Sequence, residues 1–224
     1  MIELEEVSFG YDARRTLDRV SLALDKGSFH FLTGPSGAGK TTLLKLLYLE
    51  LQPQEGRLSL IGQDTGALPQ DQRLSLRQRI GIVFQDFRLL QHLSVAENVM
   101  LPLAVHGASP AAHADDVREL IRWVGLTHRA GAAPRALSAG EQQRAAIARA
   151  VITAPDIIIA DEPTGNLDAE MGMRILKLLV ELNRLGKTVL IATHDLGLIR
   201  SAKAMVTARV LRLAEGRIAV GGAL

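Results

Sequence analysis

The chain has 224 residues, which is long enough to bury a full hydrophobic core, and it contains no cysteine. The lack of cysteine excludes disulfides and thiolate metal sites, and the length fits one large domain or one domain that carries a sub-domain. Lysine and arginine number 26 against 24 aspartates and glutamates, and so small an excess gives little reason to expect a nucleic-acid partner.

The N-terminus and the apolar runs argue against export and against a membrane span. The chain starts MIELEE, with three glutamates, whereas a secretory signal starts basic and continues into an apolar run. The longest stretch without Asp, Glu, Lys or Arg covers residues 98–114, and two prolines and a histidine interrupt it. A spanning helix needs about 20 mostly apolar residues. We therefore expect no export, and any contact with a membrane should go through a partner.

The first part of the chain is predicted to be rich in β-structure. Residues 1–33 alternate short β-rich runs with turns, and SFHFLTG (28–34) ends as a buried strand does before a glycine loop. The helix predicted next, within KTTLLKLLYLELQ (40–52), is apolar on most faces and should lie against a sheet. Residues 55–64 and 79–86 predict two further strands.

From residue 87 to 150 the pattern changes to helices and loops, which predicts a helical sub-domain inserted into an α/β core. Its last helix is the amphipathic run SAGEQQRAAIARAVITA (138–154), closed by proline. A strand (156–163), a helix (170–186) and a strand (187–195) follow, an order that implies a right-handed parallel unit. Residues 208–224 predict a closing β-hairpin. The core, residues 1–86 and 151–224, should hold a mostly parallel sheet.

The stretch GPSGAGKT (34–41) matches G-x-x-x-x-G-K-[ST] between the predicted strand and helix. Glycines let the backbone amides of such a loop point inward at a phosphate, and the following helix adds the positive end of its dipole. Lys40 should reach the β- and γ-phosphates, and Thr41 should bind Mg²⁺. The alternative is a chance glycine turn. The expected phosphate-binding residues are Gly34, Pro35, Ser36, Gly37, Ala38, Gly39, Lys40, Thr41 and Thr42.

Two carboxylates end the apolar run IIIADE (157–162). At the exposed edge of a parallel sheet, Asp161 would help to hold Mg²⁺ through water, and Glu162 would orient and deprotonate an attacking water. An ordinary strand end with two solvated acids is the alternative.

Three further residues are candidates for the same site, each with a simpler alternative. His194 follows a strand at the sheet edge where ligands bind, and could donate a hydrogen bond to the γ-phosphate. Gln85 also follows a strand and could ligate Mg²⁺ and sense the γ-phosphate. Tyr11 could stack on adenine. Taken alone, a histidine such as His194 is more often a satisfied surface or core residue, and Gln85 is a polar strand terminus. For Tyr11, an aromatic that covers the β-layer is nearly as good an interpretation.

The stretch LSAGEQQR (137–144) allows two interpretations. Ser138 and Glu141 can form a capping box, which is common and says nothing about function. Alternatively, Ser138, Ala139 and Gly140 form a small-residue helix entrance whose free amides bind a phosphate carried by another molecule, with Glu141 beside it.

The motifs GPSGAGKTT, Gln85, LSAGEQQR, IIIADE, GNLD (165–168) and His194 follow one another in this order. In this arrangement the whole chain resembles the nucleotide-binding subunits of ABC ATPases. The resemblance implies a P-loop NTPase fold of ABC ATPase type, in which residues 1–224 form one domain with a RecA-like core, an N-terminal antiparallel β-layer and the helical insertion. It implies ATP hydrolysis with Mg²⁺, with Glu162, His194 and Lys40 as catalytic residues and Thr41, Gln85 and Asp161 at the metal.

The resemblance also implies a head-to-tail homodimer that forms on ATP binding, with each ATP held between the phosphate loop of one subunit and the LSAGE segment of the other. Asn166 and Asp168 would face across the interface. Ala139 departs from the usual glycine. Its methyl group would cost about 1 kcal/mol in a left-handed backbone, but nothing in a helical first turn, where a capping box puts it.

Within the family, residues 84–103 and DEPTGNLD (161–168) resemble the group of FtsE-type cell-division ATPases, lipoprotein-release ATPases and macrolide-type exporters. Residues 48–64, EQQRAAIARAVI and the short C-terminus favour the cell-division type. This implies an FtsX-like integral membrane subunit, other division proteins as partners, a role in septal cell-wall remodelling and a peripheral location on the cytoplasmic face of the inner membrane. The alternative is the energy subunit of a lipoprotein-release or of a macrolide or peptide exporter.

Two further points concern partners. Phe87, Leu89, Leu90 and Leu93 are expected either to line a groove for a cytoplasmic helix of the membrane subunit or to form the sub-domain's own core. ATPases of chromosome maintenance or repair usually insert long coiled coils or zinc modules between the phosphate motifs, and residues 42–156 show neither sustained heptads nor cysteine. No nucleic acid is therefore expected.

Overall fold

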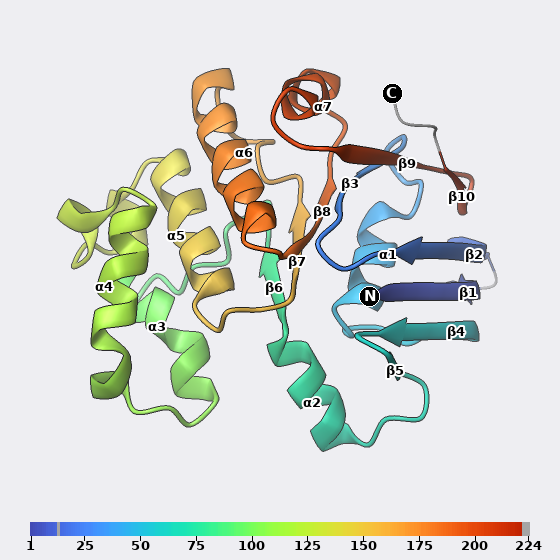
Figure 1. Cartoon of the computed structure of the whole chain (residues 1–224), viewed down its shortest axis with the longest axis horizontal. Coiled ribbons are helices and arrows are strands. Elements are labelled where there is room, and N and C mark those ends of the chain that lie inside the picture. The colour runs from blue at the N-terminus through green and yellow to red at the C-terminus, as the bar shows by residue number, and fades with distance from the viewer. Residues whose placement is uncertain (13, 221–224) are drawn as a thin grey trace.

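A six-stranded sheet organises the fold, and five of its strands are parallel (Figure 1). The computed structural model describes residues 1–12 and 14–220. The strand order is β10-β9-β3-β8-β7-β6, with β10 antiparallel at one edge. The strands are β3 (Phe29–Thr33), β6 (Ile80–Val83), β7 (Ile157–Asp161), β8 (Thr188–Ala192), β9 (Ala208–Ala214) and β10 (Arg217–Val220). This confirms the mostly parallel core sheet, and residues 208–220 of the predicted C-terminal hairpin form its edge, while residues 221–224 of that prediction lie outside the described residues.

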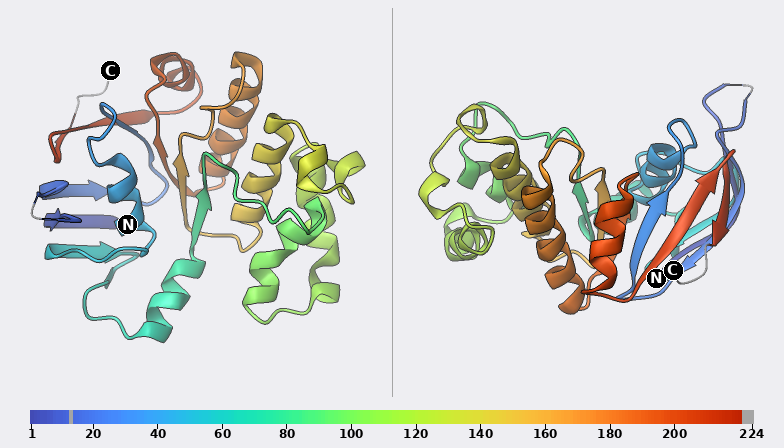
Figure 2. Two further views of the ribbon diagram at one scale, coloured as in Figure 1. Left: turned by 180° about the vertical axis from the view of Figure 1, so that it is seen from behind. Right: turned by 90° about the horizontal axis from the view of Figure 1, so that it is seen from above.

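Both faces of this sheet are covered, which explains the continuous apolar runs of its central strands. In β7, Ile157 and Ile159 pack on one face with the leucines of α1 (Lys40–Leu47). Ile158 packs on the other face with α6 (Ala169–Arg184) and α7 (Leu196–Lys203). Figure 2 shows these two helices beside the sheet, seen from above. The helix that follows the phosphate loop is therefore buried against a sheet, as predicted.

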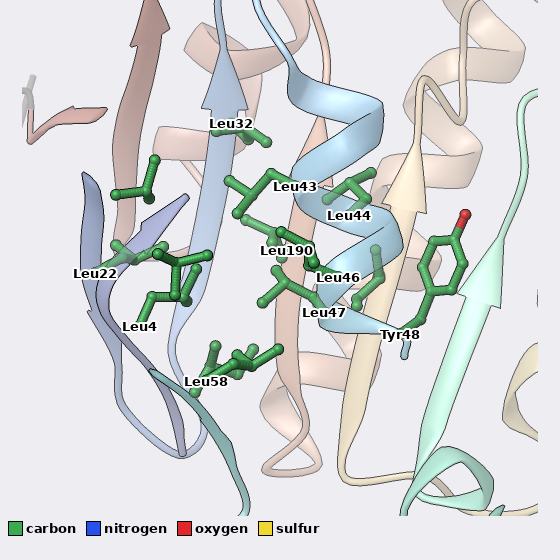
Figure 3. Close-up of a cluster of buried hydrophobic side chains, with 14 of the residues drawn as sticks. Leu4, Leu22, Leu32, Leu43, Leu44, Leu46, Leu47, Tyr48, Leu58 and Leu190 are labelled. Carbon is green, nitrogen blue, oxygen red and sulfur yellow. The ribbon is translucent and has the colours of Figure 1, made fainter. Parts of the chain in front are cut away.

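A four-stranded antiparallel sheet forms the N-terminal layer, in the order β2-β1-β4-β5. Its strands are β1 (Ile2–Phe9), β2 (Leu17–Leu24), β4 (Glu55–Leu60) and β5 (Gln63–Asp64). Leu4, Leu22 and Leu58 point from this layer toward the leucines of α1 (Figure 3). The predicted strand and turn at 55–64 form a tight hairpin, in which Ile61 and Gly62 both have positive φ (54° and 77°).

The helices α3 (Val95–Val105), α4 (Ala114–Trp123) and α5 (Ala139–Val151) lie to one side of the core sheet (Figures 1 and 2). They surround a hydrophobic cluster of their own. One side of α5 packs against the core sheet instead of this cluster, through Ile147 and Ala150. The indole Nε1 of Trp123 in α4 also donates a hydrogen bond of 3.1 Å to Glu181 of α6. The helical part therefore has its own core and is joined to the sheet mainly through α5.

Two elements differ from the prediction. Helix α1 ends at Leu47 instead of continuing to residue 52, because Leu49 turns into a left-handed conformation with φ 62°. Helix α2 (Gln70–Gln78) was not predicted. Only Leu76 of this polar helix is buried, so it lacks the apolar stripe by which a surface helix is recognised. No helix in residues 1–12 and 14–220 is long and apolar enough to cross a membrane.

Candidate functional site

The phosphate-loop segment joins β3 to α1 in a tight turn. Gly34 has no room for a side chain, since a Cβ there would lie 2.1 Å from the carbonyl oxygen of Leu213. Gly39 immediately precedes α1 with φ 101°, a conformation that residues with a side chain rarely adopt. The Nζ of Lys40 folds back over the loop and donates to the carbonyls of Gly34 (2.8 Å) and Pro35 (3.1 Å). The lysine side chain therefore lies directly on the loop.

A hydroxyl and a carboxylate meet beside this loop. The Oγ1 of Thr41, the second residue of α1, donates to the Oδ2 of Asp161, the last residue of β7, over 3.2 Å. Burial raises the pKa of Asp161, and the hydrogen bond from Thr41 works in the opposite direction. Both side chains offer the oxygen ligands that Mg²⁺ prefers, and a partly buried carboxylate is stabilised by a nearby cation. The pair therefore fits the predicted metal position.

Glu162 and His194 leave the carboxyl ends of adjacent strands, β7 and β8. The Nδ1 of His194 lies 2.8 Å from the Oε1 of Glu162, and the glutamate side chain is 13% exposed against 76% for the histidine. Since a carboxylate only accepts hydrogen bonds, Nδ1 carries a proton, which leaves Nε2 directed elsewhere. The backbone of Glu162 is left-handed (φ 44°), a conformation that non-glycine residues seldom adopt. Two predicted catalytic side chains thus form one hydrogen-bonded pair.

The segments around Gln85 and GNLD contact each other. The side-chain amide of Asn166 donates to the backbone carbonyl of Gln85 over 3.2 Å. A Cβ on Gly165 would lie only 3.3 Å from the Nε2 of Gln85, so the glycine permits this close approach. Asp168 caps α6, where its side chain accepts from the amide of Met171 (2.9 Å). Both residues expected at a dimer interface therefore also make contacts within the chain.

Helix α5 begins with the predicted capping box. The amide of Glu141 donates to the Oγ of Ser138 (3.3 Å), and the amide of Ser138 donates to the Oε2 of Glu141 (2.8 Å). The bond from the Ser138 amide is the main cause that lowers the pKa of Glu141. Ala139 is the first residue of the helix and does not have positive φ, so its methyl group causes no strain. The box uses the amides of Ser138 and Glu141 and leaves those of Ala139 and Gly140 at the helix end.

The sequence places this chain among known proteins. The profile of the ABC transporter family matches residues 17–165, which include the phosphate loop, the LSAGE segment and both carboxylates. The chain belongs to the ABC transporter family. It is an ATPase of this family, and the α/β fold with an antiparallel layer and a helical part is the ABC ATPase fold.

Curated relatives of this ABC ATPase match along nearly their whole length. The chain is 41% identical over 209 residues to the cell division ATP-binding protein FtsE of Bacillus subtilis, covering 93% of this chain and 92% of the relative. It is 44% identical to FtsE of Mycobacterium tuberculosis (97% and 94% covered) and 43% identical to FtsE of Escherichia coli (97% and 97%).

Solved ABC cassettes share the structure. The ATP-binding cassette MJ0796, in a dimeric post-hydrolysis state bound to ADP and Pi, superposes with a TM-score of 0.86 at 36% identity, covering 97% of this chain and 96% of the other. A second dimeric structure of MJ0796, described as a bacterial ABC transporter cassette, gives the same TM-score and identity.

Tyr11 of this ABC ATPase lies in the wall of a depression of about 950 Å³ that also reaches Gly37 of the phosphate loop. The ring is 58% exposed and packs edge-on against Phe9, with 5.2 Å between the ring centroids. The position leaves both sequence interpretations open, since the ring covers an aromatic of the β-layer and also borders an open space next to the phosphate loop.

Of the residues expected to line a partner groove, two belong to the core of the helical part. Leu89 is buried there, and Phe87 packs against the same cluster. An open groove of about 600 Å³ lies instead between α2 and α3. Its lining includes Leu74 of α2 and Val105 of α3, which are 50% and 75% exposed, together with Phe84.

Two polar residues of α5 were missed by the sequence analysis. Gln143 is fully buried, and its Nε2 donates to the carbonyl of Pro163 over 2.8 Å. Arg149 donates through Nη2 to the carbonyl of Phe87 (2.7 Å) and through Nη1 to that of Arg88. A signal existed for Gln143, because it shares a helix stripe with the buried Gly140 and Ile147. A polar residue on the buried stripe of an amphipathic helix needs a partner.

Proposed function

We propose that this ABC ATPase is the energy-supplying subunit of a cell-division complex, in which it pairs with an integral membrane subunit of FtsX type. The proposal is supported by the FtsE relatives at 41–44% identity over nearly the full length. The observation that carries the chemistry is the set of reactive groups at one edge of the core sheet: Lys40 on the phosphate loop, Thr41 beside Asp161, and Glu162 beside His194.

In the proposed site, ATP lies along the phosphate loop. The loop amides of residues 34 and 36–42 face the phosphates, and Lys40 leaves its two carbonyl partners to reach the β- and γ-phosphates. Tyr11 borders the depression that would take the base. Thr41, Asp161 and Gln85 would hold Mg²⁺, which when bound neutralises charge on the phosphates.

Hydrolysis then depends on the pair at the strand ends. Glu162 accepts a proton from the attacking water with the carboxylate oxygen that His194 does not hold. His194 fixes the orientation of that carboxylate through Nδ1, and its Nε2 is the ring nitrogen left to contact the γ-phosphate. Each residue therefore has its own role: Lys40 binds the phosphates, Glu162 activates water and His194 orients Glu162.

A second copy of the chain would complete each site. The amides of Ala139 and Gly140, which the capping box leaves at the start of α5, are donors suited to the γ-phosphate held by another subunit. We therefore propose a head-to-tail homodimer that closes on ATP, in which Asn166 and Asp168 lie at the interface.

Replacing Ala139 by glycine is expected to leave ATP-dependent dimerisation unchanged to within about twofold, because the alanine already has a helical backbone and causes no strain. The measurement is the dimer dissociation constant with ATP, from analytical ultracentrifugation of both proteins in the Glu162→Gln background. Ser109→Gly, outside α5, serves as the control. Tenfold tighter dimerisation of the glycine variant would contradict the helical account of Ala139.

The groove between α2 and α3 is the proposed seat of a cytoplasmic helix from the membrane subunit. Leu74 and Val105 offer exposed apolar contacts on its two helices, and Phe84 also lines it. Arg77 and Arg88 also line the groove, so the helix should carry acidic as well as apolar side chains.

Leu74→Glu and Val105→Glu are expected to abolish co-purification of the membrane subunit while ATP binding is retained, because a charge would be buried in the contact. Leu185→Glu is the matched control: this leucine is 73% exposed and lies outside the groove. The measurement is affinity capture from detergent-solubilised membranes followed by identification of the captured protein. If all three variants still captured the membrane subunit, the groove would not be its binding site. If the captured protein were a lipoprotein-release or export permease, that function would replace the cell-division assignment.

A further inference from the structure

We propose that Gln143 is a positioning residue that couples the LSAGE end of α5 to the catalytic carboxylate of the same chain. In the dimer proposed above, on which this inference rests, that end of α5 closes on the partner's ATP while Glu162 acts on the chain's own ATP. Gln143 would then make each base respond to the nucleotide bound at the other site.

The contact that carries the inference joins two segments twenty residues apart. The Nε2 of Gln143 donates to the carbonyl of Pro163 over 2.8 Å, and Pro163 directly follows Glu162. The orientation of the amide is unambiguous, because a carbonyl only accepts and so must face the nitrogen. The neighbouring carbonyls of Glu162 and Thr164 are bonded inside the loop, by the amides of Gly165 and Leu167. In the described structure, the carbonyl next to the catalytic glutamate is therefore bonded to the LSAGE helix.

Gln143 lies in the protein interior, where a polar side chain needs a specific partner. The side chain is 0% exposed, and its Oε1 has no partner among the described residues. Burying an unpaired oxygen is unfavourable, and an apolar side chain of similar size would avoid that cost. The nitrogen bond to Pro163 is the one polar contact that the buried amide makes in the described residues.

One short stretch of α5 connects Ser138 with Gln143 and so with Pro163. Gln143 lies five residues after Ser138, the N-cap of α5, a rise of about 7.5 Å along the helix. Between them, Gly140 packs so closely on α6 that a Cβ would come within 2.9 Å of the Cε of Met171. Because α5 is a single helix at this point, a shift of its capped end moves Gln143, and with it the backbone beside Glu162.

The neighbouring residue offers a matched control. Gln142 also donates through Nε2 to a carbonyl, but that carbonyl belongs to Leu137 in the same helix entrance, and the side chain is half-buried. Methionine has nearly the length of glutamine and no donor. Gln143→Met is expected to lower kcat about tenfold with KM within about twofold, whereas Gln142→Met changes neither by more than about twofold.

Gln143→Glu keeps the size of the side chain but sets a second acceptor against the carbonyl of Pro163, so it is expected to lower kcat at least as far as Gln143→Met, which a merely space-filling role would not do. Thermal unfolding of each variant shows whether it folds. Equal kcat for the two methionine variants, or a rise of KM alone, would overturn the inference. Absent turnover in the unmodified protein would instead refute the proposed function, so the two failures are distinguishable.

Mixed dimers with two affinity tags give the sharper test. One protomer carries Glu162→Gln, so that only the site with the other protomer's Glu162 turns over. Gln143→Met is then placed in either protomer. Coupling within the chain predicts slow turnover only when the substitution is in the protomer that supplies the active Glu162. Slow turnover with the substitution in the partner, which supplies the LSAGE segment to that site, would mean that Gln143 merely shapes the helix entrance and would refute the inference, as would equal rates in both arrangements.

Discussion

Replacement of Glu162 by glutamine is expected to reduce ATP turnover by about 10²- to 10⁴-fold, the range associated with loss of a general base. Glutamine is of the same size and can still contact His194, but it cannot accept the proton of the attacking water. The phosphate loop, Lys40 and the Thr41–Asp161 pair are untouched, so ATP should bind normally. The measurements are steady-state phosphate release and equilibrium binding of ATP to the same preparation.

A second readout follows from the same substitution. Since ATP binds but is not consumed, the closed dimer should persist, and size-exclusion chromatography with ATP should show a dimer that the unmodified protein forms only transiently. Glu170→Gln is the control, because Glu170 is an exposed glutamate of α6 paired with Arg174 at 2.7 Å. Turnover within tenfold of the unmodified protein would remove Glu162 from the role of base.

Lys40→Ala should fail at an earlier step, the binding of nucleotide. The Nζ of Lys40 lies on the loop itself, and charge-assisted hydrogen bonds contribute about 1.5–3 kcal/mol each. Loss of its contacts should weaken ATP binding by about 100-fold, and hydrolysis and dimerisation should fall with it. Isothermal titration with a non-hydrolysable ATP analogue measures the affinity directly.

The control for this substitution lies in the same helix. Lys45→Ala removes a lysine that pairs with Glu50 at 2.9 Å, away from the loop, and should leave ATP affinity unchanged. If Lys40→Ala bound ATP as tightly as Lys45→Ala, the loop would hold the phosphates through its backbone alone.

Local rules predicted the parts of the site that depend on neighbouring residues. The capping box of α5 follows from two residues three positions apart, and the structure confirms it because capping is satisfied within one helical turn. The meeting of Thr41 and Asp161 could be predicted for a different reason: parallel strands bring their carboxyl ends to one edge, whatever loops connect them.

The sequence analysis missed features that depend on packing between distant segments. The bond from Gln143 to Pro163 requires knowledge that α5 crosses the loop after β7. The groove could not be placed because one of its walls, α2, has a single buried residue and no apolar periodicity. The leucines after Gln85 were ambiguous for another reason: a run of apolar residues does not reveal which of them face inward.

Trp123 has a practical consequence for any study of motion in this molecule. It is the one tryptophan of the chain, and its indole bonds from α4 to Glu181 of α6, across the seam between the helical part and the core. A rotation of the helical part away from the core would break this hydrogen bond and bring water to the indole in place of the Glu181 carboxylate. The fluorescence of the unlabelled protein is therefore a built-in optical reporter of that rotation, and it can be read in a stopped-flow instrument while ATP is added.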